Sequence, residues 1–553
     1  MKAKSRTRNN ARTRAALAFV VSTAVSISVV AAVSSPPANA AAAATVVTLT
    51  FDDSNADQLP AERTLKANGL TGTFYTVDGW VGAPGYLSRA NLATISADGN
   101  EIAGHTVTHP DLIDVNPLEA QRQICDDRAT LASWGYKPVD FAYPYADANT
   151  AVEALAKGCG YNTSRGLGDV VSPASCTGCL YAETTPPADP YYLKAPDQVD
   201  STWTLANMKA EVTKAVAHKG GWVVLTFHHI CSPITAAGVL PCPADQATSP
   251  TTFNTFVSWL ASYAKTATNN TSVNTVDQEV RKYLGTNYPA YVTPQAVPNP
   301  APAAVGVNAL SNPSLETTDA FTGFPTCFQP GGWGTNATAW TTSTTAHTGV
   351  AAEQLAVTGY SSGDAKLLPT LDLGTCSPTI VPGKTYNLGT WYTSTGTTQF
   401  ALYYRDSTGA WYYWTSSPWF ATASTWTQAT FTTPAVPANA VAMTFGLALI
   451  TNGTLSTDDY SLVDPGTTPA ATATVALAVF PVAYSMVATT TRVVAATATT
   501  GAAAQAAGTA ASSSSKRSPH SHARPYLPGG KHVMTNQRIA VPELGPVGKV
   551  GKG

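Results

Sequence analysis

Charged residues are scarce in this chain of 553 residues. Only 12% of the residues are Asp, Glu, Lys or Arg, and 32 basic against 34 acidic side chains give a formal net charge of -2. This composition provides no basic surface, which argues against nucleic acid as a partner. It suits an uncharged partner such as a neutral polysaccharide.

Uninterrupted apolar runs long enough to cross a membrane are also scarce. Residues 1–40 combine a basic start, an apolar stretch at 15–33 that Ser and Thr dilute, and the small residues Ala38-Asn39-Ala40. This pattern predicts a signal peptide that is cleaved on export, with an uncleaved membrane anchor as the alternative. Residues 470–489 are apolar enough to suggest a second membrane anchor, but their Thr residues and Pro481 weaken that interpretation.

Cysteine is uncommon, but the count of eight is even. Disulfides are the default interpretation in a chain that carries an export signal. The expected pairs are Cys231 with Cys242, Cys327 with Cys376, Cys125 with Cys159, and Cys176 with Cys179. The last pair has the spacing of half a zinc knuckle or of a redox pair. No second Cys pair with knuckle spacing follows, so a local loop disulfide is favoured.

Strand-like and helical patterns alternate between residues 46 and 284. The expected strands are 46–51, 71–77, 100–105, 139–143 and 222–227, and the expected helices are 57–68, 88–99, 116–135, 149–157 and 204–219. Strand 222–227 is apolar throughout, which implies burial on both faces and a parallel sheet wrapped by helices. We therefore expect a β/α barrel over 41–290, with an open doubly wound sheet as the alternative.

The remaining chain divides into three segments by composition. Residues 291–304 are rich in Pro and Ala and predict a semi-rigid linker. Residues 305–465 contain short strands rich in Thr, Tyr and Trp, which predict an all-β sandwich. About half of its aromatic side chains are expected in the core, and the remainder in a platform for sugar rings. Residues 466–553 are rich in Ala and Thr and are predicted to be disordered.

Two adjacent carboxylates, Asp52 and Asp53, end the strand 46–51. Neighbouring side chains on an extended chain point apart, so one acid can face a metal while the other serves as a base. A turn that caps the next helix is the alternative. His105 and His109 are four residues apart, and a helical turn would place both on one face, close enough to share a metal.

Together with Asp53, this histidine pair forms a set of two imidazoles and one carboxylate, which leaves coordination positions free for water and substrate. His228 follows the strand 222–227, and the alternation of that strand favours an acid that faces the barrel lumen. Its neighbour His229 is then expected to be structural.

Four motifs occur in order: Thr50-Phe51-Asp52-Asp53, His105-Thr-x-x-His109, Ala142-Tyr143-Pro144-Tyr145 and Leu225-Thr226-Phe227-His228. In this, the chain resembles the polysaccharide deacetylases of carbohydrate esterase family 4, the NodB-homology domain, over about 46–284. Such domains are distorted β/α barrels, so the resemblance implies a distorted barrel here. The resemblance implies Asp52 as general base, His228 as general acid and the Tyr145 backbone N–H at the oxyanion. It also implies Asp53, His105 and His109 as ligands of a divalent metal, commonly zinc.

The chain departs from the family pattern at two points. Many relatives carry, at the position of Ala142, an arginine that orients the base, so we expect changed surroundings for Asp52. The motif of an Asp followed by a Trp, which supports the acid histidine, matches only loosely at Asp200 and Trp203. Asp197 is a competing candidate for that support.

The β region resembles jelly-roll carbohydrate-binding modules at 312–316 and 458–462. There, Glu316 and Asp459 are candidates for a structural calcium site, with exposed acids on edge strands as the alternative. We thus expect a secreted or cell-wall-associated monomer that hydrolyses N-acetyl groups of chitin or peptidoglycan. Alternatives are an acetylxylan esterase, a non-catalytic glycan-binding protein and, disfavoured by the export signal, a deacetylase of small molecules such as acetylated polyamines.

Overall fold

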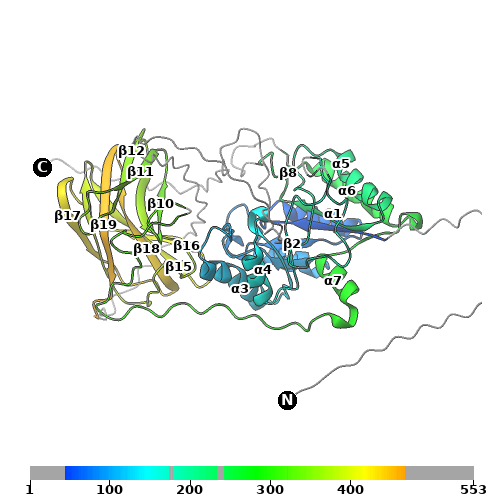
Figure 1. Ribbon diagram of the computed structural model, residues 1–553, viewed down its shortest axis with the longest axis horizontal. Helices are drawn as coiled ribbons and strands as arrows, with labels where there is room; N and C mark the ends of the chain where they lie inside the picture. Colours follow the sequence, from blue (N-terminus) through cyan, green and yellow to red (C-terminus); the bar gives the residue numbers. More distant parts are fainter. Residues whose placement is uncertain (1–43, 174–175, 177, 233–241, 321, 467–553) are drawn as a thin grey trace, which may run out of the picture. The chain divides into compact units, whose positions relative to one another are not determined.

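The computed structural model describes residues 44–173, 176, 178–232, 242–320 and 322–466 (Figure 1). The predicted signal peptide and nearly all of the predicted tail lie outside the described residues. Among the residues that are described, no helix combines the length and the apolar character that a membrane span requires.

A parallel sheet forms the centre of the β/α domain, with strand order β5-β4-β3-β2-β1-β6. The strands are β1 (Thr45–Phe51), β2 (Thr73–Thr76), β3 (Glu101–Gly104), β4 (Asp140–Ala142), β5 (Thr163–Arg165) and β6 (Gly221–Phe227). Strand β9 (Thr271–Val273) pairs with the first residues of β1, whereas β2 pairs with its last residues. The sheet therefore curves as an irregular half-barrel, which confirms the predicted distorted β/α fold.

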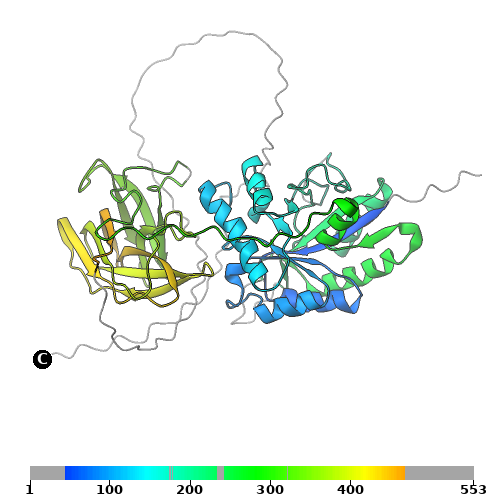
Figure 2. The ribbon, with the colours of Figure 1, turned by 90° about the horizontal axis from the view of Figure 1, so that it is seen from below.

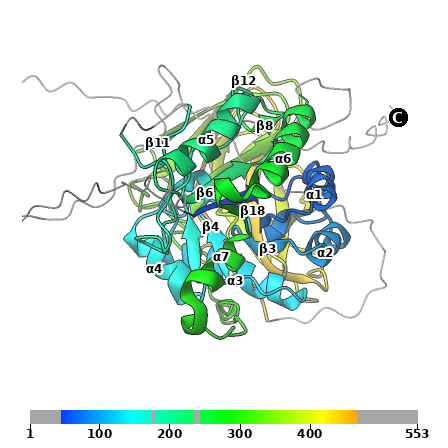
Figure 3. The ribbon, with the colours of Figure 1, turned by 90° about the vertical axis from the view of Figure 1, so that its right-hand side faces the viewer.

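Helices cover the outside of this sheet, as Figures 2 and 3 show. They are α1 (Gln58–Ala67), α2 (Arg89–Ala97), α3 (Pro117–Ser133), α4 (Thr150–Gly158), α5 (Leu205–Ala217) and α6 (Pro250–Ala264). Helix α7 (Val276–Leu284) packs on the lumen side instead. Local sequence accounts for several helix starts, because Ser88 and Thr204 form capping boxes and Asn116 accepts a hydrogen bond from Leu118 N–H ahead of Pro117. The five predicted helices thus begin and end within about two residues of their expected bounds.

Side chains of strands β1 and β6 alternate between two layers, one beneath the outer helices and one in the lumen. Val47, Leu49 and Phe51 face outward, where they pack with Val223, Leu225 and Phe227 beneath the helices. Val46, Trp222 and Val224 face the lumen, where Val276 and Val280 of α7 also pack. Because side chains alternate along a strand, the next positions, Asp52 and His228, also face the lumen.

The β domain is a sandwich of two five-stranded antiparallel sheets, as predicted. One sheet has the order β10-β13-β18-β15-β16 and the other β11-β12-β19-β14-β17. The strands are β10 (Phe328–Trp333), β11 (Ala337–Ser343), β12 (Ala352–Thr358), β13 (Asp364–Pro369), β14 (Asn387–Ser394), β15 (Thr398–Asp406), β16 (Trp411–Ser416), β17 (Ala423–Thr432), β18 (Ala440–Leu449) and β19 (Gly453–Val463).

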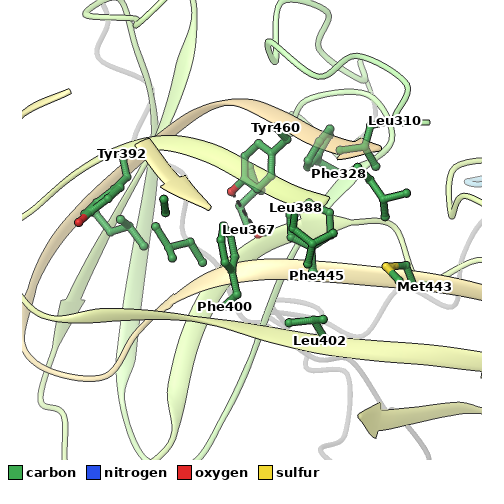
Figure 4. Close-up of a cluster of buried hydrophobic side chains, with 14 of the residues drawn as sticks. Leu310, Phe328, Leu367, Leu388, Tyr392, Phe400, Leu402, Met443, Phe445 and Tyr460 are labelled. Atoms are coloured by element: carbon green, nitrogen blue, oxygen red, sulfur yellow. Dashed lines mark hydrogen bonds between the residues drawn. The ribbon is translucent and has the colours of Figure 1, made fainter. Parts of the chain in front are cut away.

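Apolar side chains from both sheets fill the space between them (Figure 4). Tyr460 of β19 packs against Phe328 and donates a hydrogen bond to the Leu367 carbonyl of the facing sheet. Tyr392 and Tyr404 are also buried, whereas Tyr413 and Trp419 are 44% and 55% exposed. The aromatic residues therefore divide between core and surface, in keeping with the sequence-based expectation.

All four predicted disulfides are present: Cys125–Cys159, Cys176–Cys179, Cys231–Cys242 and Cys327–Cys376. The segment predicted as a linker contains no helix or strand, but part of it is held against α3. Arg122 donates hydrogen bonds to the carbonyls of Val297 and Pro298, and Val297 N–H donates to Asp126. These contacts anchor residues 297 and 298 to the β/α domain.

Two buried carboxyl groups, Glu101 and Asp140, lie at the beginning of β3 and β4. Thr73 donates a hydrogen bond to Glu101, and Thr163 donates one to Asp140. Burial raises the pKa of both carboxyl groups, and the proximity of the two acids raises that of Asp140 further. The folded domain therefore retains a proton here at a pH at which the unfolded chain has lost it.

This retained proton predicts a pH-dependent stability. Below about pH 4 both states are protonated; as the pH rises toward the folded-state pKa, only the unfolded state ionises, so the wild-type protein loses stability. Asp140→Asn removes the part of this loss that Asp140 contributes and should raise the free energy of unfolding at pH 8 by on the order of 1 kcal/mol. Denaturant titrations of the full chain at pH 4, 6 and 8 check this.

Asp245→Asn, at an exposed aspartate, is the matched control and should leave the pH dependence unchanged. Equal stability of Asp140→Asn and wild type at pH 8 would contradict the assignment of a retained proton.

Candidate active site

The two acids at the end of β1 separate because the chain turns sharply there. Asp53 and Ser54 have φ values of 72° and 59°, in the left-handed region. Asp52 stays in the lumen, 2% exposed, while Asp53 turns toward the loop after β3. Helix α1 starts at Gln58 with Asp57 at its N-cap, so neither Asp52 nor Asp53 caps it, and the alternative interpretation of the pair as a helix cap is wrong.

The two histidines converge without a helical turn, contrary to the sequence-based expectation. His105 and His109 lie in the loop after β3, where Thr106 and His109 have φ values of 70° and 59°. The Thr106 hydroxyl accepts a hydrogen bond from His109 N–H, at 2.9 Å. This tight turn brings the ring centroids of His105 and His109 within 4.7 Å.

Asp53, His105 and His109 form a compact set of metal-ligating atoms. Asp53 Oδ1 lies 3.4 Å from His105 Nε2 and 3.3 Å from His109 Nε2. His105 Nδ1 lies 2.8 Å from the Ala142 carbonyl oxygen, which accepts a hydrogen bond from Nδ1–H and so leaves Nε2 directed toward Asp53. The ligand atoms of the three residues all lie within 4.8 Å of one another, so the set fits one ion.

The charge states also suit a cation. Burial lowers the pKa of His109 to about 4, so its ring is neutral and has a lone pair for a metal. Burial alone would raise the pKa of Asp53, but the proximity of His109, His105 and His228 outweighs it and holds the pKa well below its usual range. Two imidazoles and one carboxylate are a donor set typical of catalytic zinc.

Asp52 and His228 face each other across the lumen beside this set. Asp52 Oδ2 lies 3.9 Å from His228 Nε2, while Asp52 Oδ1 is buried and has no hydrogen-bond partner among the described residues. Burial lowers the pKa of His228. One carboxylate oxygen is therefore free to accept a proton near the ligand set.

The support of His228 by Asp200 stays a prediction. Asp200 accepts hydrogen bonds from the backbone N–H and the hydroxyl of Thr202, and Asp197 accepts one from Ser172. His228 Nδ1 has no hydrogen-bond partner in the described part of the chain. His229, by contrast, is paired with Asp57 at 2.8 Å, which agrees with its expected structural role.

Aromatic side chains surround His109 at the mouth of the site. Tyr145 is 57% exposed and has φ of 57°, and its ring contacts His109 edge to face at 4.8 Å. Trp80, which the sequence analysis did not single out, lies 5.4 Å from the same imidazole. Trp80 ends the short 3-10 turn Asp78–Trp80, four residues after β2, and this position in a loop beyond a strand end was the available signal.

Arg165 is the second residue that the sequence analysis missed. Its guanidinium forms an ion pair with Asp52 Oδ2, and both side chains are almost fully buried. Arg165 ends β5, a three-residue strand absent from the predicted elements. The available signal was a single arginine that follows Asn162-Thr163-Ser164, at the C-terminal end of a short β-prone run.

Comparison with known proteins agrees with these observations. The polysaccharide deacetylase family model matches residues 39–164, which include Asp52, Asp53, His105, His109 and Tyr145. The match ends one residue before Arg165 and does not include His228.

Solved structures of deacetylases and a carbohydrate esterase are similar to part of this chain. The Streptococcus pyogenes deacetylase PplD in complex with acetate is 24% identical over 23% of this chain and 58% of its own, with a TM-score of 0.22. The family 4 carbohydrate esterase from Streptomyces lividans is 18% identical over 42% of this chain and 93% of its own, with a TM-score of 0.28. The peptidoglycan deacetylase PdaC from Bacillus subtilis is 18% identical over 44% and 98%, with a TM-score of 0.26. Scores this low do not determine the function of this chain.

The ligand set predicts metal binding that is independent of catalysis. Calorimetric titration of the full chain with zinc should give one tight site, and Asp53→Asn or His109→Ala should weaken it on the order of 100-fold or more, because each removes a ligand. His218→Ala, in an exposed histidine that stacks on Tyr181, is the control and should bind zinc as wild type does. Unchanged affinity in Asp53→Asn would rule out this ligand set.

Proposed function

We propose that this chain, whose residues 39–164 match the polysaccharide deacetylase family model, is an exported, metal-dependent hydrolase that removes acetyl groups from a polysaccharide. The observation that carries the proposal is the convergence of three metal-ligating side chains, a buried carboxylate and a buried imidazole at one end of the lumen. Disulfides in the described domains suit a protein exported to an oxidising compartment.

Hydrolysis of an acetyl group requires a nucleophilic water, stabilisation of the oxyanion and a proton for the leaving group. A divalent ion held by Asp53, His105 and His109, zinc by our expectation, would lower the pKa of a water and polarise the acetyl oxygen. Asp52 Oδ1, which has no other partner among the described residues, accepts the proton of that water. The Tyr145 backbone N–H donates to the oxyanion.

His228 delivers a proton to the leaving atom. Its Nε2 lies beside Asp52 Oδ2, so the base and the acid flank the same reacting centre. An amine leaving group from an N-acetyl sugar depends on this proton more than a sugar hydroxyl does, because an amide nitrogen is the poorer leaving group. Both an amide and an ester nonetheless suit the same set of residues.

N-acetylglucosamine polymers, meaning chitin-like chains or peptidoglycan, are the first choice of substrate, and acetylxylan is the alternative. The exposed ring of Tyr145 and the nearby Trp80 support a sugar substrate, since aromatic faces stack on pyranose rings. The low overall charge of the chain supports an uncharged polymer.

We further propose that the sandwich binds carbohydrate and keeps the enzyme near its polymer. The exposure of Tyr413 and Trp419 supports this role. A structural calcium ion at Glu316 and Asp459 stays a prediction. Glu316 accepts hydrogen bonds from Val350 N–H and Ala351 N–H, and Asp459 pairs with His347, so both acids already hold the neighbouring segment.

Acetate release by the purified mature chain tests the activity. The enzyme is assayed with zinc and with chelator on chitin oligomers, peptidoglycan and acetylxylan in parallel. We expect zinc-dependent release of acetate from one polymer, and that polymer identifies the substrate class. If a folded protein that binds zinc releases no acetate from any of the three polymers, a non-catalytic glycan-binding protein is favoured.

The assignment of base and acid predicts two further losses. Asp52→Asn and His228→Ala should each lower kcat on the order of 100-fold or more, because each removes a positioned proton acceptor or donor. Zinc affinity should stay close to wild type, since neither residue belongs to the ligand set. His229→Ala is the neighbouring control, and a loss of kcat equal to that of His228→Ala would contradict the assignment.

The proposed binding role of the sandwich predicts an effect on polymer affinity alone. Trp419→Ala should weaken binding to the insoluble substrate polymer by roughly fivefold to tenfold, because a stacked ring contributes about 1 kcal/mol. Turnover of a short soluble oligomer should not change. Co-sedimentation with the polymer measures the first quantity, and Val350→Ala, at an exposed aliphatic side chain of the same domain, is the control.

A further inference from the structure

The third family motif of this chain contains Ala142 where many relatives have an arginine that orients the base. The structure contains an arginine at the next strand instead. Ala142 ends β4 and Arg165 ends β5, and the two residues are register partners in this parallel pair. Register partners on neighbouring strands direct their side chains to the same face of the sheet, which here is the lumen.

Ala142 projects only a methyl group into the lumen beside Arg165. Ala142 is fully buried and belongs to the lumen cluster with Tyr75 and Ala103. The guanidinium of Arg165 lies over the ring of Tyr75, 5.1 Å from its centroid, and forms the ion pair with Asp52 Oδ2 at the end of β1. Arg165 thus reaches the base from a strand that stands four places away in the sheet order.

This contact makes the two carboxylate oxygens of Asp52 different, because only one of them is paired. Oδ2 is held by Arg165, and Oδ1 is left without a partner among the described residues. A carboxylate that is fixed through one oxygen presents the other in a defined direction, which is what a general base requires. The planar guanidinium suits this task because its N–H groups project in fixed directions.

We propose that Arg165 is the positioning residue of Asp52, supplied by β5 in place of the arginine that the third motif lacks at Ala142. This inference rests on the proposed function, because it assigns a role relative to the base of that reaction. It predicts that the site is complete although Ala142 stands where many relatives have an arginine, because Arg165 provides the guanidinium from β5.

A purely structural ion pair is the competing explanation, and kinetics of the full chain separate the two. Arg165→Met retains an apolar stem of similar length without the charge, and Arg165→Lys retains the charge without the planar fork. For Arg165→Met we expect kcat to fall at least about 100-fold with KM within threefold of wild type and zinc affinity unchanged. For Arg165→Lys we expect a smaller loss, of about tenfold, with thermal stability close to wild type.

Arg128→Met is the matched control, because Arg128 is equally buried in the same domain but donates to the Pro138 and Cys159 carbonyls rather than to a carboxylate. It should retain kcat within about threefold. A loss of kcat in Arg128→Met equal to that in Arg165→Met would assign the effect to domain stability and overturn the proposal.

The double variant Asp52→Asn/Arg165→Met provides the decisive comparison. If Arg165 acts only through Asp52, the double variant should be no slower than Asp52→Asn alone, within about threefold. A double variant in which both losses multiply would overturn the proposal, as would an Arg165→Met protein with wild-type kcat. A wild-type protein that binds zinc but releases no acetate would instead overturn the proposed function. Failure of the proposed function is therefore distinguishable from failure of the role proposed for Arg165.

Discussion

The register of β1 against β6 is the constraint on which the site depends. These strands pair in parallel from Thr45 opposite Gly221 to Phe51 opposite Phe227, and Thr50 donates a hydrogen bond to Thr226 across the pair. Because side chains alternate with a period of two, this register places Asp52 and His228 together in the lumen. A slip of one residue in one strand would turn its Asp52 or His228 side chain into the helix layer and bring an apolar residue inward.

The lumen contains a buried ion pair, although charged residues are scarce in this chain. Asp52 and Arg165 are both almost fully buried, and such a pair costs considerable desolvation energy that a well-packed apolar pair would avoid. Its presence at the C-terminal ends of the strands, where loops meet substrate in β/α folds, argues for a functional reason. The second buried acid cluster, at Glu101 and Asp140, lies at the opposite ends of the strands and is expected to affect stability alone.

Much of the fold could be predicted because local patterns and packing agree. The capping residues Ser88 and Thr204 and the apolar strand 222–227 mark elements that the structure contains nearly unchanged. The prediction of a helical turn at His105 to His109 was wrong, since the spacing of two histidines does not encode backbone angles. Left-handed conformations at Thr106 and His109 achieve the same convergence. Strand β5 was missed because three residues provide too little periodicity to recognise.

The sequence by itself determined the residue types at the site and their order, because four spaced motifs place acids and histidines at strand ends. It also suggested the four disulfide pairs, which the structure contains, and the change from a β/α to an all-β region. Only the tertiary structure decided which residue faces Asp52. Arg165 lies 113 positions away in the sequence and contacts Asp52 across the lumen of the curved sheet, from a strand that is four places from β1 in the sheet order. Contacts of this kind depend on how strands close around a lumen, which no local pattern along the chain records.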